Sequence, residues 1–235
     1  MLNPSIVTIA DAYWASHLGC PPHSMFAAPL SIQVHGGELS DYRGAFALFR
    51  NGAAIASVPL ACVDRLKMLL SPVLSGCSPE SFATSLAPIA SVVIGPAYIG
   101  YAAAVNPPKH PARSLMPGDA SALRALQSAC DPTEWEHGGS ASDGPASGVF
   151  DKDELVAVAS YEVWGGSIAH ISIITHPDFR GQGLGRSAVA HLAQRAILSG
   201  LLPQYRTLES NVSSIRVAKA LGFQHYAASM AVRLK

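Results

Sequence analysis

Apolar residues in the first hundred positions follow the periods of both helices and strands. The pattern predicts a helix over residues 4–18, a hairpin over 44–58 and a β-rich stretch over 91–104. The hairpin prediction rests on Asn51-Gly52, because this dipeptide tolerates positive φ at both central positions of a tight turn. The N-terminal part is therefore expected to form a small α+β unit.

Apolar periodicity stops between residues 106 and 118, a stretch that contains Pro107, Pro108, Pro111 and Pro117. Proline-rich segments without apolar periodicity are typical of connections between domains. We therefore expect three parts, which are an N-terminal accessory unit at 1–105, a linker at 106–118 and a second domain at 119–235.

The second half alternates helical and strand patterns. Helices are predicted to begin near Asp119, Leu184 and Val212, and strands are predicted within 148–175, over 204–209 and over 223–234. Helices that alternate with strands pack their apolar faces on a shared sheet. The predicted fold class is therefore α/β, with helices against one mixed sheet.

Composition narrows the classes of function. Apolar residues make up 49% of the chain and charged residues 14%, as in folded globular proteins. Sixteen basic residues balance sixteen acidic ones, so no nucleic-acid partner is expected, because such binding usually needs a basic excess. No apolar run reaches the roughly 18–20 residues of a membrane span, and the N-terminus lacks a signal-peptide pattern. We expect a cytoplasmic protein without a membrane partner.

The cysteines and histidines give little sign of metal or disulfide chemistry. Four scattered cysteines form no C-x-x-C pair, which favours reduced thiols. His17, Cys20 and His23 are metal-ligand residue types, but their spacing matches no established zinc site. No metal is therefore expected.

A glycine-rich stretch, Thr175–Arg186, lies between a predicted strand and a predicted helix. Such a junction leaves backbone N–H groups free at the helix N-terminus, where the helix dipole also favours negative charge. The P-loop is excluded because Arg186-Ser187 follows the last glycine, and the dinucleotide fingerprint is excluded because Arg186 and Ala188 are not glycine. The stretch predicts a phosphate-bearing ligand of another kind.

Two motifs in this half resemble one family. Arg180–Gly185 resembles the Q/R-x-x-G-x-G/A signature of the GCN5-related N-acetyltransferases (GNAT), and Asn211 followed by Leu221-Gly222-Phe223 resembles the second motif of that family. The resemblance covers roughly residues 115–235. It implies a GNAT-like acyl-CoA N-acyltransferase fold for the second domain.

The resemblance also implies a site for acetyl-CoA as cosubstrate. Backbone amides of the glycine-rich stretch would hold the pyrophosphate, the end of the preceding strand would hold the pantetheine arm, and an asparagine side chain would bind that arm. The implied residues are Ile173, Ile174, Thr175, Arg180, Gly181, Gln182, Gly183, Leu184, Gly185, Arg186 and Asn211. The family often has a tyrosine as general acid, and the matching position here is Ala218.

Three residues are candidates for moving the amine proton. Glu136 and His137 lie in the Gly/Ser-rich segment 131–148, where the family usually builds its acceptor pocket, although Trp135 could simply anchor a surface loop there. Glu209 lies at the end of a predicted strand and could act through water or pair with an arginine. Glu162 and His170 also lie within predicted strands, but alternation alone does not tell which face they occupy.

We therefore expect an acetyl-CoA-dependent N-acetyltransferase that acts on a primary amine of a small molecule or peptide by direct attack. The alternative is a non-catalytic acyl-CoA-binding regulatory module, which Ala218 favours. The acceptor amine cannot be read from the sequence. The N-terminal unit could be a degenerate copy of the same fold that closes the acceptor site, or it could form a homodimer.

Overall fold

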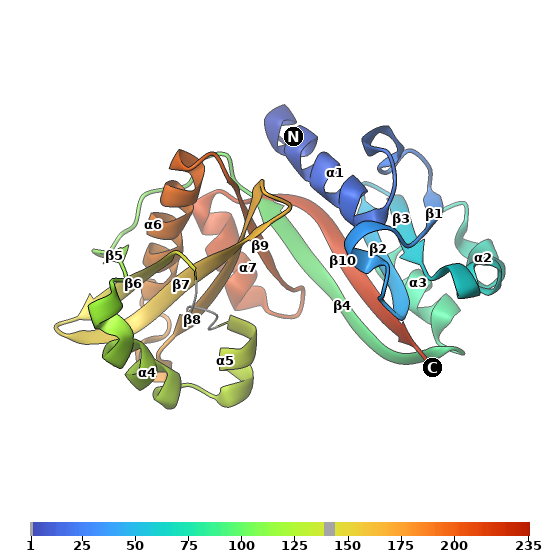
Figure 1. The fold of residues 1–235 in the computed structure, drawn as a ribbon. Helices are drawn as coiled ribbons and strands as arrows, with labels where there is room; N and C mark the ends of the chain where they lie inside the picture. Colours follow the sequence, from blue (N-terminus) through green and yellow to red (C-terminus); the bar gives the residue numbers. More distant parts are fainter. Residues whose placement is uncertain (1, 139–143) are drawn as a thin grey trace. The chain divides into compact units, whose positions relative to one another are not determined.

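The computed structural model describes residues 2–138 and 144–235 (Figure 1). The chain divides into two compact units. The first contains Met1–Ile99, Thr207–Val212 and His225–Lys235, and the second contains Gly100–Arg206 and Ser213–Gln224.

Within its described residues, the first unit combines strands with three α-helices. Its helices are α1 (Pro4–Leu18), α2 (Val63–Leu70) and α3 (Pro79–Leu86), and its strands are β1 (Leu30–Val34), β2 (Gly44–Arg50), β3 (Ala53–Val58) and most of β4 (Ala90–Tyr101) and β10 (Gln224–Leu234). These strands pair in the order β1-β3-β2-β10-β4. Phe49, Leu66, Phe82 and Met230 are among the buried residues of its core.

Local sequence signals fix the helix and hairpin that were predicted in this unit. Asn3 accepts a hydrogen bond from the N–H of Ser5 (3.0 Å) at the start of α1, and Gly19 ends the helix at φ 77°. Asn51 and Gly52 adopt φ 53° and 80° between β2 and β3. Both predictions are confirmed.

The last strand of the chain belongs to the first unit. β10 pairs antiparallel with β2, from Ala228↔Phe49 to Arg233↔Gly44. Tyr226, Met230 and Val232 are buried, so this strand completes the core of the first unit although it begins more than 170 residues after β2 ends. The compact units thus divide the chain differently from the predicted parts at 1–105 and 119–235.

The second unit contains the other elements. Its helices are α4 (Ala120–Ala129), α5 (Pro132–Gly138), α6 (Leu184–Leu198) and most of α7 (Val212–Leu221), and its strands are β5 (Arg113–Ser114), β6 (Ala146–Asp151), β7 (Glu154–Trp164), β8 (Ile168–Thr175) and most of β9 (Leu202–Leu208). These strands pair in the order β9-β8-β7-β6-β5, with β8 and β9 parallel and the other pairs antiparallel. The predicted mixed α/β sheet is confirmed.

Helices cover both faces of the second unit's strands. Val158 and Ile174 pack with Leu126 of α4 on one face. On the other face, Ile173 and Thr175 lie against the first turn of α6. This arrangement follows from strand alternation, because neighbouring residues of β8 point to opposite faces.

The segment 106–118 is held to the second unit rather than standing apart as a linker. Its residues Arg113 and Ser114 form β5 and pair with β6. Arg113 also binds both carboxylate oxygens of Asp119 (2.7 and 2.8 Å) and lies 4.0 Å over the ring of Phe150. These contacts supply the order that the proline-rich composition did not predict.

A short helix also replaces part of a segment that was predicted to be irregular. α5 begins after Asp131, whose carboxylate accepts hydrogen bonds from the N–H groups of Thr133 (2.8 Å) and Glu134 (3.2 Å). The helix is short and mostly polar, so it carries no apolar periodicity that could reveal it.

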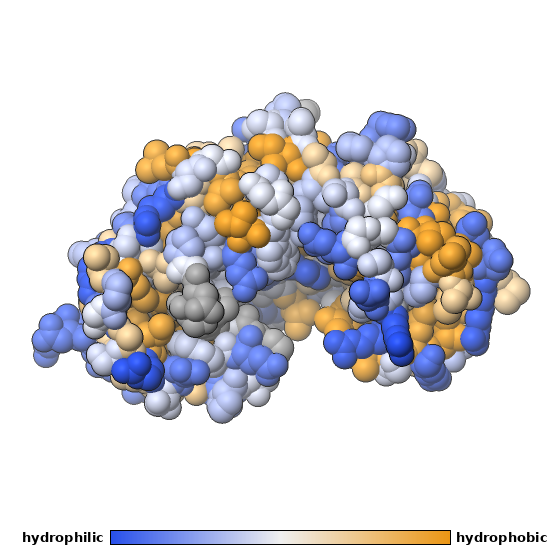
Figure 2. Space-filling model, in the orientation of Figure 1, coloured by the Kyte–Doolittle hydropathy of each residue, from blue (hydrophilic) through white to orange (hydrophobic). Residues whose placement is uncertain are grey.

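Hydrophilic and apolar areas are interspersed on the surface of both units (Figure 2). Exposed apolar side chains include Leu60, Met68 and Leu198. Among the described residues, no helix has the length and apolar character that crossing a membrane requires.

Candidate functional site

Three glycines shape the turn between β8 and α6, for two different reasons. Gly181 and Gly183 adopt φ 79° and 82°, a backbone conformation that strains other residues. Gly185 has ordinary dihedrals, but a Cβ there would lie 2.5 Å from Oγ1 of Thr175 and 2.9 Å from Cδ1 of Ile173. Gly185 therefore allows the first turn of α6 to lie directly against the end of β8.

This turn exposes a set of backbone donors that fits a diphosphate. The N–H of Ser187 makes the first bond along α6, to the carbonyl of Gly183 (3.2 Å), so the N–H groups of Leu184, Gly185 and Arg186 have no acceptor within the helix. α6 has 15 residues and no acid in its first turn. Free donors, the helix dipole and Arg186 all favour a bound anion here.

The side chain of Arg180 is engaged within the protein. Its Nε donates to the carbonyl of Thr175 (3.2 Å), and its two terminal nitrogens donate to the carboxylate of Glu134 (2.6 and 3.3 Å). Both side chains are about half exposed. Arg180 therefore joins the glycine-rich turn to α5, the helix that carries the predicted proton carriers.

β8 and β9 separate beside this turn. They pair in parallel from Ile168↔Leu202 to Ile171↔Tyr205. The pairing between these two strands ends there, while β8 continues to Thr175. The last four residues of β8 therefore have backbone groups on the β9 side that can bind an extended ligand.

Two residues that the sequence reasoning missed support the glycine-rich turn. The N–H groups of Lys109 and His110 donate to Oγ of Ser187 (3.2 and 3.0 Å), and the ring of His110 lies 3.1 Å from the carbonyl oxygen of Gln182. They come from the segment that was expected to be a linker, so no local motif could have pointed to them.

α5 brings the predicted acceptor segment to β8. A Cβ at Gly138 would lie only 2.6 Å from the carbonyl oxygen of Ile173, so the C-terminal end of α5 touches this strand closely. Glu136 is exposed on the same helix, and His137 belongs to it by its backbone. Residues 139–143, the rest of the predicted loop, lie outside the described residues.

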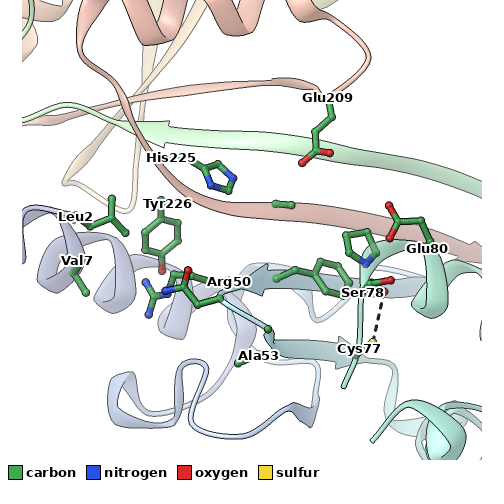
Figure 3. Close-up of a pocket in the computed structure, with 15 residues that line it drawn as sticks. Leu2, Val7, Arg50, Ala53, Cys77, Ser78, Glu80, Glu209, His225 and Tyr226 are labelled. Carbon is green, nitrogen blue, oxygen red and sulfur yellow. Dashed lines mark hydrogen bonds between the residues drawn. The ribbon is translucent and has the colours of Figure 1, made fainter. Parts of the chain in front are cut away.

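Glu209 lies in the first unit, on the wall of a cavity of about 850 Å³ (Figure 3). Arg50 and Tyr226 line the same cavity, and both bind Asp11: the guanidinium at 2.8 and 3.2 Å, and the hydroxyl at 2.6 Å. Glu80 reaches into the cavity from the start of α3 (Figure 3). The catalytic role of Glu209 stays a prediction.

Asn211 also belongs to the first unit, in the stretch Thr207–Val212. Its N–H donates to the carbonyl of Leu208 (2.9 Å), in the turn that leads into α7. Its predicted role in binding a pantetheine arm therefore stays a prediction.

The side chains of Glu162, His170 and Gln204 form one row across three strands of the second unit. Glu162 pairs with His170 between β7 and β8, and His170 pairs with Gln204 between β8 and β9. Nδ1 of His170 lies 2.8 Å from Oε1 of Gln204, and the ring stacks on Trp164 with centroids 3.7 Å apart. Burial lowers the pKa of His170 to about 4, although the bond to Gln204 opposes this shift.

The position at which the family often has a tyrosine is inaccessible to solvent in this protein. Ala218 is fully buried on α7. One turn earlier, the hydroxyl of Ser214 lies 2.9 Å from that of Tyr205 on β9. Burial raises the pKa of Tyr205, and the bond to Ser214 partly opposes this.

Comparisons with known proteins identify a family whose model covers the glycine-rich turn. A model of the acetyltransferase (GNAT) family matches residues 114–223. A solved GNAT-family acetyltransferase from Colwellia psychrerythraea is 15% identical, covers 100% of this chain and 98% of its own, and has a TM-score of 0.56, which shows a shared fold.

A GNAT-family acetyltransferase from Novosphingobium aromaticivorans is 24% identical, with a TM-score of 0.48. It covers 61% of this chain, which in turn spans 65% of that protein. No curated protein matches the chain.

Proposed function

Residues 114–223 belong to the acetyltransferase (GNAT) family, and we propose that the chain is an acetyl-CoA-dependent N-acetyltransferase that acts on a primary amine of a small molecule or peptide. The observation that carries the proposal is the turn between β8 and α6. Two glycines with positive φ and a third that admits no Cβ leave free N–H groups at the start of a 15-residue helix.

In this proposal the N–H groups from Gly181 to Arg186 bind the pyrophosphate of acetyl-CoA. The extended end of β8, Ile173–Thr175, offers backbone groups to the pantetheine arm, beside the point where β9 diverges. An arm held as a further strand on an open edge is fixed along its length, which sets the position of the thioester.

The proposed reaction is direct transfer in a ternary complex. The lone pair of a neutral amine attacks the thioester carbonyl carbon, so that a C–N bond forms and the C–S bond breaks. The amine loses one proton to a base, and the sulfur leaves as the thiolate of CoA. Glu136 and His137 are proposed proton carriers because their helix lies against Ile173.

A second candidate function is a non-catalytic acyl-CoA-binding regulatory module. The burial of Ala218 favours it, because no acidic side chain stands at that position to protonate the leaving sulfur. Both candidates predict binding of acetyl-CoA. They differ in turnover, which should appear as release of free thiol from acetyl-CoA with at least one primary amine from a panel of polyamines, aminoglycosides, amino acids and peptides.

Binding itself is tested by Gly183→Glu, which puts a carboxylate and a strained backbone at the proposed pyrophosphate site. We expect the thermal shift caused by acetyl-CoA to disappear. Gly200→Glu is the matched control, since Gly200 has φ 77°, has open space around it and lies just beyond the other end of α6. An unchanged shift in Gly183→Glu, with the control also unchanged, would contradict the binding site.

A further inference from the structure

The row Glu162–His170–Gln204 stands at the point where β8 and β9 separate. The pair His170↔Gln204 lies next to Ile171↔Tyr205, the last pair between β8 and β9. Alternation along β8 puts His170 on the face that holds Ile174 and α4, whereas Ile173 faces α6. The row is thus on the opposite face of β8 from the side chains against α6, and beside the proposed thioester position.

The imidazole of His170 is held in one orientation by Gln204, whose amide is oriented by Tyr101, and by the ring of Trp164. Nε2 of the buried Gln204 donates to the hydroxyl of Tyr101 (2.5 Å), which leaves Oε1 of Gln204 to accept from Nδ1–H of His170. The ring lies almost parallel to that of Trp164, at 11°. A neutral imidazole that donates through Nδ1 carries its lone pair on Nε2.

Nε2 of His170 has no hydrogen-bond partner among the residues that the structure describes. The charged groups near the ring are Glu162 on β7 and Arg206 on β9. Glu162 is exposed and accepts a hydrogen bond from Nε1 of Trp164 (3.3 Å). The exposed carboxylate of Glu162 can attract an ammonium group, and the neutral Nε2 of the less exposed His170 can accept a hydrogen bond from nitrogen. This pair of groups suits an ammonium that must lose a proton before it can attack.

We propose that this row is the acceptor-amine site, in which Glu162 attracts a primary ammonium group and Nε2 of His170 accepts a hydrogen bond from the neutral amine that attacks the thioester. The inference rests on the proposed function. It assigns a substrate class, a primary amine that is cationic in solution, and it assigns residues other than Glu136, His137 and Glu209.

The chemical step balances with the groups already named. The bound ammonium first releases one proton to water, which leaves the neutral amine. As the C–N bond forms, the nitrogen gains positive charge, and a second proton moves from it to Nε2 of His170. The C–S bond then breaks, and the imidazolium passes the proton to the CoA thiolate or to water, which restores the neutral ring. Gln204 acts as a positioning residue because it holds Nδ1 and never touches the substrate.

The test compares two substitutions of His170. Asparagine puts a polar atom near the position of Nδ1 and keeps the bond to Gln204, whereas glutamine puts one near the position of Nε2. We expect His170→Asn to lower kcat for the best amine of the panel about 100-fold or more, within the usual range for a group that carries a proton. His170→Gln should retain more kcat than His170→Asn, and the KM for acetyl-CoA should stay unchanged in both.

His23→Asn is the matched control, because His23 is an exposed histidine of the first unit. A purely structural role of His170 predicts the reverse order, with His170→Asn the milder change because it keeps the bond to Gln204. A kcat of His170→Asn within twofold of the wild type would overturn the proposal. If the wild type itself released no thiol with any amine although acetyl-CoA bound, the proposed function would fail first, and this proposal with it.

Glu162 gives an independent measurement. Glu162→Gln should raise the KM for the amine several-fold and weaken its dependence on salt, because an exposed carboxylate attracts a cation mainly through a screened charge. Trp164→Phe keeps an aromatic ring against His170 and removes the bond from Nε1 to Glu162. An amine KM for Glu162→Gln equal to that of the wild type at low salt would contradict the attraction step.

Discussion

The guanidinium of Arg180 binds both carboxylate oxygens of Glu134, at 2.6 and 3.3 Å. This ion pair connects the glycine-rich turn to α5. It also means that the positive charge of Arg180, beside the proposed pyrophosphate site, is already paired with a carboxylate. An anion bound at the turn would therefore compete with Glu134 for the same arginine.

Removing this competition should strengthen donor binding. Glu134→Gln frees the guanidinium, and since an exposed ion pair contributes at most about 1 kcal/mol, we expect acetyl-CoA to bind up to about fivefold more tightly. The Kd should be measured by calorimetry at two salt concentrations, with Glu136→Gln as a control that removes the same charge from the same helix. Weaker binding in Glu134→Gln would show that the pair supports the site instead of competing with it.

The contact between Gly138 and the carbonyl of Ile173 should be sensitive to a single methyl group. A Cβ at Gly138 would lie 2.6 Å from that oxygen, so Gly138→Ala must move the end of α5 away from β8. We expect a loss of about 1–3 kcal/mol in the free energy of unfolding and a higher KM for the amine. Gly118→Ala is the control, because nothing lies within 4 Å of its Cβ.

Urea unfolding and steady-state kinetics check this prediction. If Gly138→Ala had the stability and the amine KM of the wild type, α5 would not be held in place by its approach to β8.

Restoring the family's tyrosine should not restore an acid. Ala218 is fully buried, so a tyrosine there must displace its neighbours. Ala218→Tyr should destabilise the protein by about 1–3 kcal/mol or more through overpacking, without raising thiol release. Lys219→Tyr, at an exposed position of the same helix, should leave stability nearly unchanged. A stable Ala218→Tyr variant with faster turnover would show that the helix has room for an acid at this position.

The parts of the fold that the sequence predicted are those whose cause is local. The turn at Asn51-Gly52, the cap at Asn3 and the glycines before α6 each follow from a few neighbouring residues. The parts that it missed depend on distant pairing. Phe49 and Ala228 are partners across the β2–β10 ladder, and no periodicity within β10 reveals which strand it joins.

The residues of the candidate site also fall into a group that local sequence could predict and a group that depends on distant pairing. Gly181, Gly183 and Gly185 form a motif because one turn needs all three, so they could be found by spacing alone. Glu162 and His170 are neighbours only through the register of β7 and β8, and the sequence could not tell which face they occupy. Ser187 binds the backbone of residues 109 and 110 across more than 75 positions, and no motif records this.

The half-buried His170 should make stability depend on pH in a defined window. Burial lowers the pKa of His170 to about 4 from 6.5, so the unfolded chain binds more protons than the folded one between these values. The contribution of the neutral ring to the free energy of unfolding is complete above pH 6.5. It is lost as the pH falls toward 4, and the loss is at most about 3 kcal/mol. His170→Asn should lose this dependence.

Urea unfolding at pH 7, 5.5 and 4.5 measures the effect as the difference between the wild type and His170→Asn. Asp119→Asn is an informative control: Arg113 and the N–H of Met116 lower the pKa of Asp119 to about 2, so its contribution is present above pH 3.8 and is lost only as the pH falls from there toward 2. It should therefore leave the slope between pH 6.5 and 4.5 unchanged. Equal slopes for the wild type and His170→Asn in that window would mean that His170 is solvated enough to be protonated in the folded protein.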